Sequence, residues 1–333
     1  MARIYYDEDA DPRALATETI AILGYGIQGR AQALNLRDSG ARVIVGNRAD
    51  QYREQAEADG FHVLDLKGAA REGTLIVVLL PDETQPQIFH EAIRTSLAPG
   101  DGLVFAHGFT VRYGLIDPPP DVDLMLLAPR MPGHYVRRRY LERWGVPAFV
   151  AVERNASGRA WNRLLGLAYA LGVTRCAAIE LGFAQETELD HFSEHFLYPL
   201  IFRTIELAFE ALIDAGYPAE AAVMELHGSG ELGQVLETAA REGLYAMIQS
   251  HASPACQVGI AHHWHQAIGD EADVRRRINQ VLEIIRDGRF ARFLLTEQQH
   301  GYPELQQWRA TRSTALVEAE RRLQQMLRGL RRS

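Results

Sequence analysis

A glycine pattern near the N-terminus is the feature that most narrowly limits how this chain can fold. The segment TIAILGYGIQGRAQALNL places a short apolar run before Gly24, Gly26 and Gly29 and a stretch with helical spacing after them. In a strand–turn–helix unit, the first glycine allows a tight turn, the second lets a pyrophosphate approach the backbone, and the third lets the helix pack on the strand. This context predicts a dinucleotide-binding loop, which the spacing alone would not. The expected cofactor contacts in the loop are Gly24, Tyr25, Gly26, Ile27, Gln28 and Gly29.

Apolar runs and amphipathic stretches alternate through the first half of the chain. The strand candidates are TIAILG, RVIVG, TLIVVLL, GLVFAHG, VDLMLLAP and PAFVAV. Such runs suit strands that are covered on both faces, so their alternation with helices predicts an α/β Rossmann domain with a doubly wound parallel sheet. From Phe183 onward, long helical periods replace the strands. We therefore predict a nucleotide-binding domain over residues 1–182 and an all-α domain over residues 183–333.

The overall composition excludes several classes of protein. A net charge of −8 argues against nucleic acid as a partner, because phosphate contacts need a basic face. The N-terminus has no apolar signal core, and no run of about 18 apolar residues, as a membrane span needs, occurs anywhere. Cys176 and Cys256 lie far apart and outside any C-x-x-C pattern, which is typical of a reducing compartment. We expect a cytoplasmic protein that binds no membrane.

The residues at the end of the second predicted strand bear on the choice between NADPH and NADH. An NAD enzyme places a carboxylate there for the ribose hydroxyls, whereas this chain has Asn47 and Arg48, with Arg53 a turn later. A guanidinium matches a 2′-phosphate bidentately, so these residues favour NADPH. Asp50, in the same loop, is the counter-argument because its charge would repel the phosphate.

Several histidines are candidates for chemistry. His107 follows the fourth predicted strand, at the sheet edge where a nicotinamide lies in open α/β folds. It could orient substrate or water, or serve the structure alone, and the sequence leaves both open. The group His262, His263 and His265 favours a surface helix end over a zinc site, because no second cluster of ligands accompanies it.

Beyond these single motifs, the chain resembles ketol-acid reductoisomerase, the NADPH enzyme of branched-chain amino-acid synthesis. The stretches that carry the resemblance are AILGYGIQGRAQALNLRDSG, LLPDETQ, FAHGF, AP-x-x-PGH-x-VRR-x-Y and ETELDHFSEH. The resemblance implies a Rossmann domain, a knotted all-α domain for substrate, metal and dimer contacts, and an entwined homodimer of the short (class I) form whose active site takes residues from both subunits. It also implies cofactor contacts at Leu80, Pro81, Asp82, His107 and Gly133.

The resemblance further implies metal and substrate ligands. Asp190 and Glu194 match one pair of magnesium ligands, and their spacing puts both carboxylates on one face of a helix. Glu225 matches the first position of the second pair, but Ser229 stands at the second, and Glu231 would replace it only after a shift in register. Ser250 matches a substrate-contacting serine, and Glu225 is a further candidate for substrate contact.

The chain departs from the family most clearly at Arg130. The family carries a lysine there, set against two magnesium ions, and uses it in moving an alkyl group. Arginine does not release its proton at physiological pH and presents a wide planar fork, so the exchange is not conservative at such a site. With Ser229 also in place of a ligand, we expect one magnesium ion or none rather than two. The expected catalytic residues are Arg130, His107, Asp190 and Glu194.

These departures predict an NADPH-dependent reductase on a reductoisomerase scaffold. It would transfer hydride to a C=O or C=N carbon (a ketone, an imine, an iminium or a dihydropyridine) of a small polar metabolite without alkyl migration. Altered catalytic ligands in a family member are what we expect of specialised (natural-product) biosynthesis. One alternative is an active ketol-acid reductoisomerase that converts 2-acetolactate to 2,3-dihydroxyisovalerate. Another is a non-catalytic NADPH-binding protein, which an intact glycine loop beside an altered metal site would allow.

Overall fold

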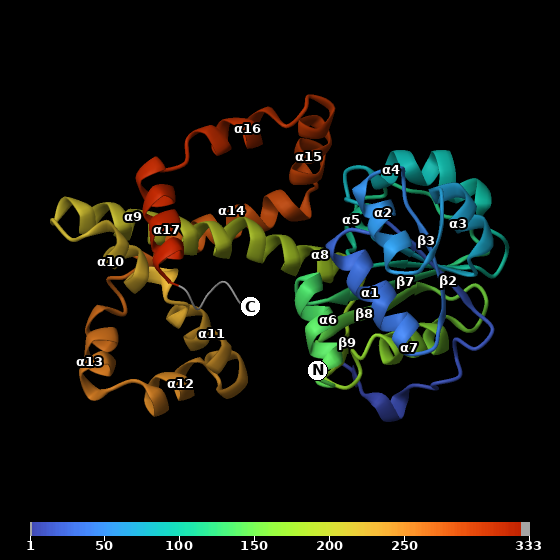
Figure 1. Cartoon of the computed structure of the whole chain (residues 1–333), viewed down its shortest axis with the longest axis horizontal. Coiled ribbons are helices and arrows are strands. Elements are labelled where there is room, and N and C mark those ends of the chain that lie inside the picture. Colours follow the sequence, from blue (N-terminus) through green and yellow to red (C-terminus); the bar gives the residue numbers. More distant parts are fainter. Residues whose placement is uncertain (1, 328–333) are drawn as a thin grey trace. The chain divides into compact units, whose positions relative to one another are not determined.

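The computed structural model describes residues 2–327, and the chain divides into two compact units (Figure 1). The first unit runs to Asp190 and the second begins at His191, so the division falls within helix α8 (Phe183–Phe192). The domain boundary predicted between residues 182 and 183 lies at the start of the same helix.

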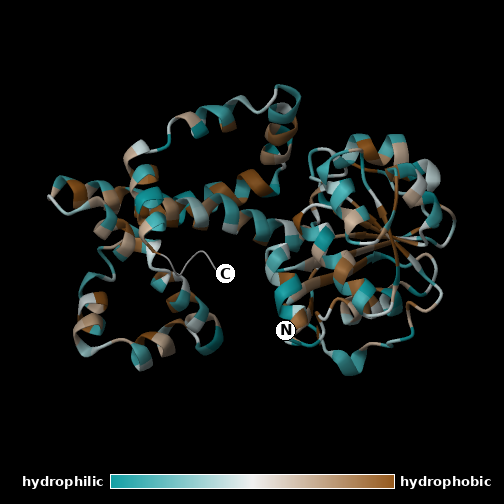
Figure 2. Cartoon of the chain, viewed as in Figure 1, coloured by the Kyte–Doolittle hydropathy of each residue, from teal (hydrophilic) through white to brown (hydrophobic). Residues whose placement is uncertain are grey.

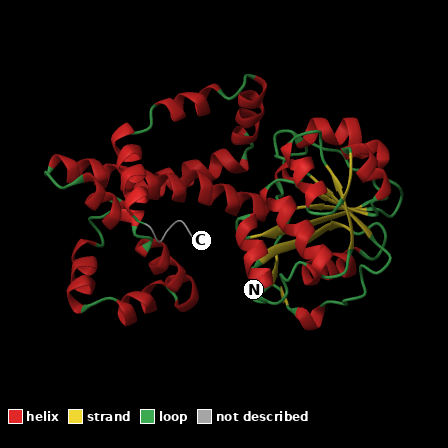
Figure 3. Cartoon of the chain, viewed as in Figure 1, coloured by secondary structure: helices red, strands yellow, loops and turns green. Residues whose placement is uncertain are grey.

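The first unit is built on one sheet, whose strands are yellow in Figure 3. The strand order is β1-β9-β8-β7-β6-β5-β2-β3-β4. The strands are β1 Ile4–Tyr5, β2 Thr19–Leu23, β3 Arg42–Gly46, β4 His62–Leu64, β5 Leu75–Val78, β6 Gly102–Phe105, β7 Asp123–Pro129, β8 Ala148–Arg154 and β9 Ala178–Glu180. All six strands predicted from the apolar runs are present. The strands from β4 across to β7 pair in parallel, which confirms the Rossmann fold class.

The prediction of a parallel sheet was wrong at one side of the molecule. Strand β8 runs antiparallel to β7, and β1 runs antiparallel to β9, so the whole sheet is mixed. The connection from β7 to β8 stays at the carboxyl edge of the sheet, where the Arg130 amide donates to the Pro147 carbonyl at 2.9 Å. The connecting helix α6 (Gly133–Leu141) packs on α1 (Ile27–Asp38) through Val136 and Ala31 instead of crossing the sheet. The chain therefore returns in the opposite direction.

Helices cover both faces of this sheet because alternate strand residues point to opposite sides. Ile20 and Ile22 of β2 pack with α1 and α7, whereas Ala21 and Leu23 pack with α3 and the α4 region. Apolar residues accordingly concentrate on the central strands (Figure 2). The remaining helices of the unit are α2 Gln51–Ala58, α3 Leu66–Glu72, α4 Gln85–Ile88, α5 Phe109–Arg112 and α7 Ala160–Ala170, with short turns η1 Asp7–Asp9, η2 Phe89–Ile93 and η3 Arg94–Ser96.

A buried arginine connects the amino ends of four strands. Arg163, on α7, is 2% exposed and donates to Glu18 before β2, to the Thr74 carbonyl before β5, to the Gly100 carbonyl before β6 and to Asp123 of β7. Burial alone would raise the pKa of Glu18, but the hydrogen bonds from Arg163 and Thr74 hold it below its usual value. The buried carboxylate is therefore ionised and paired.

The described part of the second unit is helical, as predicted (Figure 3). Its helices are α9 Tyr198–Asp214, α10 Ala219–Val223, α11 Glu231–Glu242, α12 Leu244–His251, α13 Pro254–His263, α14 Glu271–Arg286, α15 Arg289–Gln299, α16 Pro303–Ala310 and α17 Thr314–Met326, with π-turns η4 Ser193–Leu197 and η5 Met224–Gly228. A small core joins α9, α10 and α17 around Phe209, Val223 and Leu323. Within residues 2–327, no helix has the length and apolar content needed to span a membrane.

Candidate functional site

The glycine loop after β2 has the geometry that the sequence predicts. Gly24 has φ +95°, and a Cβ there would lie 2.7 Å from the Leu79 carbonyl oxygen. A Cβ on Gly29 would lie 1.9 Å from the Gly24 carbonyl oxygen, whereas one on Gly26 would meet nothing within 4 Å. The first turn of α1 contains no acidic residue, and no side chain caps its amides. The open space at Gly26 and these amides therefore fit the pyrophosphate of a dinucleotide.

Two of the predicted cofactor residues instead brace the loop from inside. The Tyr25 side chain is 1% exposed, and its hydroxyl donates to Asp59 at 2.8 Å. Asn47 at the end of β3 is also buried, and its side-chain oxygen accepts from the Tyr25 amide at 3.0 Å. These contacts tie the glycine loop to the neighbouring loop and set its position. The side chains of Tyr25 and Asn47 therefore support the loop from the protein interior.

The start of α6 closes on the start of α1. A Cβ on Gly133 would lie 2.1 Å from the Ile27 carbonyl oxygen, so only glycine allows the two helices to meet here. The Gln28 side chain donates to the Met131 carbonyl at 2.8 Å and fastens the same junction. Gly133 and Gln28 thus bring the segment after β7, which carries Arg130, next to the glycine loop.

The loop after β3 holds the arginines that were predicted to bind a 2′-phosphate. Arg48 has a side chain that is 84% exposed, and its Nε donates to Asp50 at 2.9 Å. Asp50 also accepts from the amides of Tyr52 and Arg53, so its carboxylate caps α2, and Arg48 and the other hydrogen bonds hold its pKa below the usual value. Arg53 in turn donates to Glu57 at 3.0 Å. The guanidinium of Arg48 is largely exposed, but a carboxylate already accepts from the amides at the helix start.

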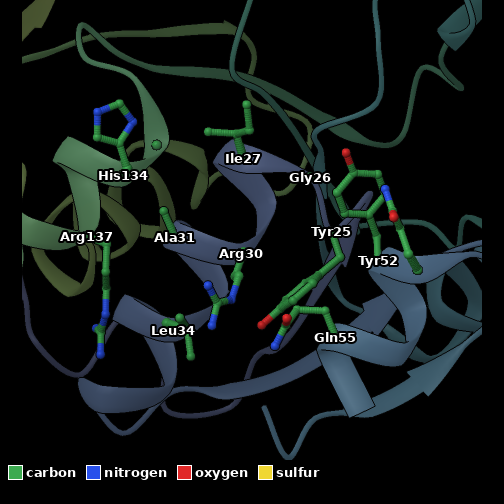
Figure 4. A pocket seen from close by; sticks show the side chains of 12 residues that line it. Tyr25, Gly26, Ile27, Arg30, Ala31, Leu34, Tyr52, Gln55, His134 and Arg137 are labelled. Carbon is green, nitrogen blue, oxygen red and sulfur yellow. The ribbon is translucent and has the colours of Figure 1, made fainter. Parts of the chain in front are cut away.

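A cavity of about 550 Å³ lies beside this loop (Figure 4). It contacts Gly26 and Ile27 at the start of α1, Tyr52 and Gln55 on α2, and His134 at the start of α6. None of Asp82, His107 and Arg130 lines it. The cavity is therefore a candidate for the nucleotide end of the cofactor, and Asp82, His107 and Arg130 belong to a separate group of side chains.

Three strand ends and one helix form that group, which we call the cation–carboxylate cluster: Asp82, His107, Arg130, Glu186 and Asp190. Asp82 follows β5, His107 follows β6 and Arg130 follows β7, while Glu186 and Asp190 lie four residues apart on α8. Arg130 donates through Nη1 to Glu186 at 3.1 Å and through Nη2 to Asp190. Its guanidinium also lies 5.3 Å from the centre of the Phe149 ring. The fork of Arg130 therefore spans the two carboxylates of the helix.

His107 carries the second cation of the cluster. Its Nδ1 lies 2.6 Å from Asp82, and its Nε2 lies 3.5 Å from Asp190. Burial alone would lower its pKa, but the hydrogen bond and charge of Asp82, with the charges of Glu186 and Asp190, raise the pKa to about 9. With this pKa, His107 is protonated at neutral pH. The contact with Asp82 also orients the ring.

Glu186 is fully buried, and the sequence reasoning missed it. Burial raises its pKa to about 7, against the opposing effects of His107, of the Gly108 amide that donates to it at 2.8 Å, and of Arg130. Near neutrality it therefore exists in both protonation states. Its position four residues before Asp190 in ETELD was the available signal, because that spacing puts both on one helical face.

The other predicted residues, Glu194, Glu225 and Ser250, belong to the second unit. Glu194 lies in η4 of the second unit, where its carboxylate converges with His191 and His195. Glu225 lies in η5 and Ser250 in α12, and both are exposed. The structure thus brings together Arg130, His107 and Asp190 of the predicted catalytic residues, while Glu194 belongs to the other unit.

Comparison with known proteins identifies the family. The model described as acetohydroxy acid isomeroreductase, NADPH-binding domain, matches residues 14–177, and that of the ketol-acid reductoisomerase C-terminal domain matches residues 183–328. The chain belongs to the ketol-acid reductoisomerase family. This confirms the resemblance read from the motifs, and the chain is an oxidoreductase with the family's NADPH-binding domain.

Individual relatives cover nearly the whole chain. A ketol-acid reductoisomerase (NADP(+)) of Pyrobaculum arsenaticum is 41% identical over 307 residues, 92% of each chain, and one of Caldivirga maquilingensis is 40% identical over 309 residues, again 92% of each. The solved structure of an NADH-preferring ketol-acid reductoisomerase from an uncultured archean is similar, with a TM-score of 0.92 and 35% identity over 98% of this chain and 99% of that one.

The residues around Asp190 do not fit the two magnesium ions that the resemblance implies. Arg130 donates to Asp190, and protonated His107 lies 3.5 Å from the same carboxylate. This carboxylate is engaged by the guanidinium of Arg130, so an ion bound at Asp190 would have to displace that contact.

The second implied ligand pair is also incomplete. Ser229, which has no carboxylate, stands four residues after Glu225, where the π-turn η5 has ended. Glu231 begins a separate helix, α11, after Gly230 with φ +83°. Glu231 therefore does not continue the helical register of Glu225.

The loop after β3 yields a prediction about cofactor choice. Arg48→Ala should weaken NADPH binding about tenfold, since a hydrogen bond to a charged group contributes roughly 1.5–3 kcal/mol and Arg48 is largely solvated. NADH binding should be nearly unchanged. Asp50→Asn should strengthen NADPH binding, because it removes a negative charge and keeps the cap on α2. Titration calorimetry with both cofactors measures this, and equal losses for NADPH and NADH in Arg48→Ala would remove Arg48 from phosphate recognition.

The raised pKa of His107 yields a prediction about stability. Its pKa of about 9 in the folded chain lies above the ordinary 6.5, so the proton stabilises the fold. This stabilisation is complete below the ordinary value and is lost as the pH rises through the folded value; it amounts to about 3 kcal/mol at about 1.4 kcal/mol per pKa unit. Urea unfolding should give the wild type a larger free energy of unfolding than His107→Asn, and this difference should shrink between roughly pH 6 and roughly pH 10. A difference that is constant with pH would contradict the assignment.

Proposed function

We propose that this enzyme is an NADPH-dependent reductase that transfers hydride to a C=O or C=N carbon of a small polar metabolite without alkyl migration. The electrophile is a ketone, an imine, an iminium or a dihydropyridine-like carbon, as suits a step of specialised biosynthesis. The observation that carries the proposal is the pairing of Arg130 with both Glu186 and Asp190. Migration on the family's scaffold relies on two magnesium ions, and this pairing engages Asp190, one of the residues that the resemblance implies would hold them.

Arg130 retains the ability to bind an anionic substrate. Its side chain is 28% exposed, so part of it remains accessible to a ligand beside the two carboxylate contacts. A fixed guanidinium binds a substrate carboxylate or phosphate in a defined orientation and holds the electrophilic carbon against C4 of the nicotinamide. Orientation of this kind needs no proton transfer by Arg130 itself.

The cluster also contains protons that a reduction can use. Hydride addition to C=O or C=N leaves a negative charge on oxygen or nitrogen, and a proton must follow. His107, with a pKa of about 9, and Glu186, with a pKa of about 7, both carry protons near neutrality. NADPH supplies the hydride when it is bound, and these two side chains are the proposed source of the proton.

The second candidate is an active ketol-acid reductoisomerase with arginine at position 130. The identity of 41% with a relative of that name over 92% of the chain favours it. In that case the enzyme would convert 2-acetolactate to 2,3-dihydroxyisovalerate, and Arg130 would replace the family's lysine without loss of migration. One assay separates the two.

We also propose that two copies of the chain associate, with residues of both at the active site. The second unit has only a small buried core and many exposed apolar side chains, among them Phe202, Tyr245, Val258 and Trp308 at 63% exposure or more. Such surface is usually covered by a partner. Light scattering should give the mass of a dimer, and a monomer at micromolar concentration would contradict this.

The assay uses 2-acetolactate, NADPH and magnesium, with product analysis and the Pyrobaculum arsenaticum relative as a positive control. We expect no 2,3-dihydroxyisovalerate from the wild type, and none from Arg130→Lys, because Ser229 still leaves the second ligand pair incomplete. The matching probe for reduction alone is 3-hydroxy-3-methyl-2-oxobutanoate, in which the methyl group has already moved. Arg130→Ala should lower kcat/KM for any carboxylate substrate that the wild type reduces, and should affect uncharged analogues less.

Formation of the diol from 2-acetolactate by the wild type, at a rate comparable with that of the relative, would overturn the proposal. It would show that arginine suffices for migration and would establish the second candidate.

A further inference from the structure

Three side chains of the second unit converge as metal ligands do. One donor atom each from His191, Glu194 and His195 lies within 4.8 Å of the other two. His191 and His195 are four residues apart, and their rings stack with centroids 4.8 Å apart and planes at 22°. Glu194, three residues after His191, lies on the same side of the helix. The helix itself therefore sets the spacing of two imidazoles and a carboxylate.

Two further features distinguish this group from an ordinary helix face. The chain passes from α8 into the π-turn η4 (Ser193–Leu197) at this point, and π-turns are rare and occur frequently at functional sites. A second such turn, η5, carries Glu225, and a third, η2, lies elsewhere in the first unit. The Phe290 ring packs against both imidazoles, at 5.1 Å from His191 and 4.1 Å from His195. Contact with this ring restricts the orientations that the two imidazoles can adopt.

We propose that His191, Glu194 and His195 bind one divalent transition-metal ion of the zinc class. Two imidazoles and one carboxylate suit Zn²⁺, Co²⁺ or Ni²⁺, whereas Mg²⁺ prefers oxygen ligands and a nearly complete octahedron. The site differs in donors and in metal from the pair Asp190 and Glu194 that the resemblance implies. It uses Glu194, but not Asp190, which Arg130 engages.

The geometry needs only small side-chain movements to close around an ion. Ligands about 2.0 Å from a tetrahedral zinc lie roughly 3.3 Å apart, so the present separations of up to 4.8 Å would shorten. Three protein ligands leave a fourth position for water or a substrate atom, as in catalytic zinc sites. The only other group of this kind within residues 2–327 is His107, Glu186 and Asp190. There Arg130 forms ion pairs with both carboxylates.

The test measures binding of Zn²⁺ and Co²⁺ to the metal-free full-length protein by titration calorimetry, and the visible absorption of the Co²⁺ form. We expect one ion per chain, bound in preference to Mg²⁺. His195→Gln and Glu194→Gln should each lower the affinity for Zn²⁺ and alter the Co²⁺ spectrum. Loss of an outer-shell partner of a metal ligand lowers affinity roughly 10–100-fold, and loss of a ligand should lower it by at least as much. The matched control is the double variant His262→Gln with His263→Gln, which removes an exposed histidine pair from α13 of the same unit and should change neither.

Three outcomes would overturn the proposal. Zn²⁺ binding that is unchanged in His195→Gln and Glu194→Gln would show that these residues are not ligands. Binding lost in the His262 and His263 control would mark adventitious surface histidines. Metal that survives His195→Gln but is lost in Asp190→Asn would place it at the family's magnesium position. None of these readouts depends on the substrate, so they are independent of the reductase assay. Circular dichroism of each variant shows whether it is folded, and His191→Gln supplies a further ligand variant.

Discussion

The guanidinium of Arg163 is the contact on which the first unit depends. It joins Glu18, the Thr74 and Gly100 carbonyls and Asp123, so four strands begin level at the amino edge of the sheet. Breaking a buried pair of this kind typically costs about 3–5 kcal/mol, which makes other strand registers unfavourable. Because parallel strands that begin level also end close together, the loops after β2, β5, β6 and β7 meet at the carboxyl edge. The glycine loop and the cation–carboxylate cluster both form there.

Most of this fold could be predicted from local sequence patterns, because strands and tight turns depend on residues that are close together in the chain. The apolar runs gave the central strands, and the glycine spacing gave the loop, since the Cβ atoms absent at Gly24 and Gly29 would clash with backbone at 2.7 and 1.9 Å. The direction of β8 was not predictable in this way. It depends on α6 packing on α1 through Gly133, a contact between segments about a hundred residues apart that no periodicity records.

The sequence predicted most residues of the candidate site, but it did not predict which of them contact one another. Arg130, His107 and Asp190 were found from their positions after strands or from the family's motif. That Arg130 would pair with Glu186, 56 residues on, requires knowing that α8 returns to the carboxyl edge of the sheet. The burial that raises the pKa of Glu186 is likewise a tertiary property. In the loop after β3, Arg48 and Asp50 were both identified, but their mutual ion pair appeared only in the structure.

Arginine at position 130 changes which group can move a proton. A lysine can lose its proton when it is buried among other cations, whereas a guanidinium stays charged. Arg130 therefore remains a cation beside Asp190 throughout any reaction. Proton transfer then depends on the two members of the cluster whose pKa values lie nearest neutrality, His107 and Glu186. Asp82 holds the imidazole and Arg130 holds the carboxyl, so both groups have a fixed position at the carboxyl edge of the sheet.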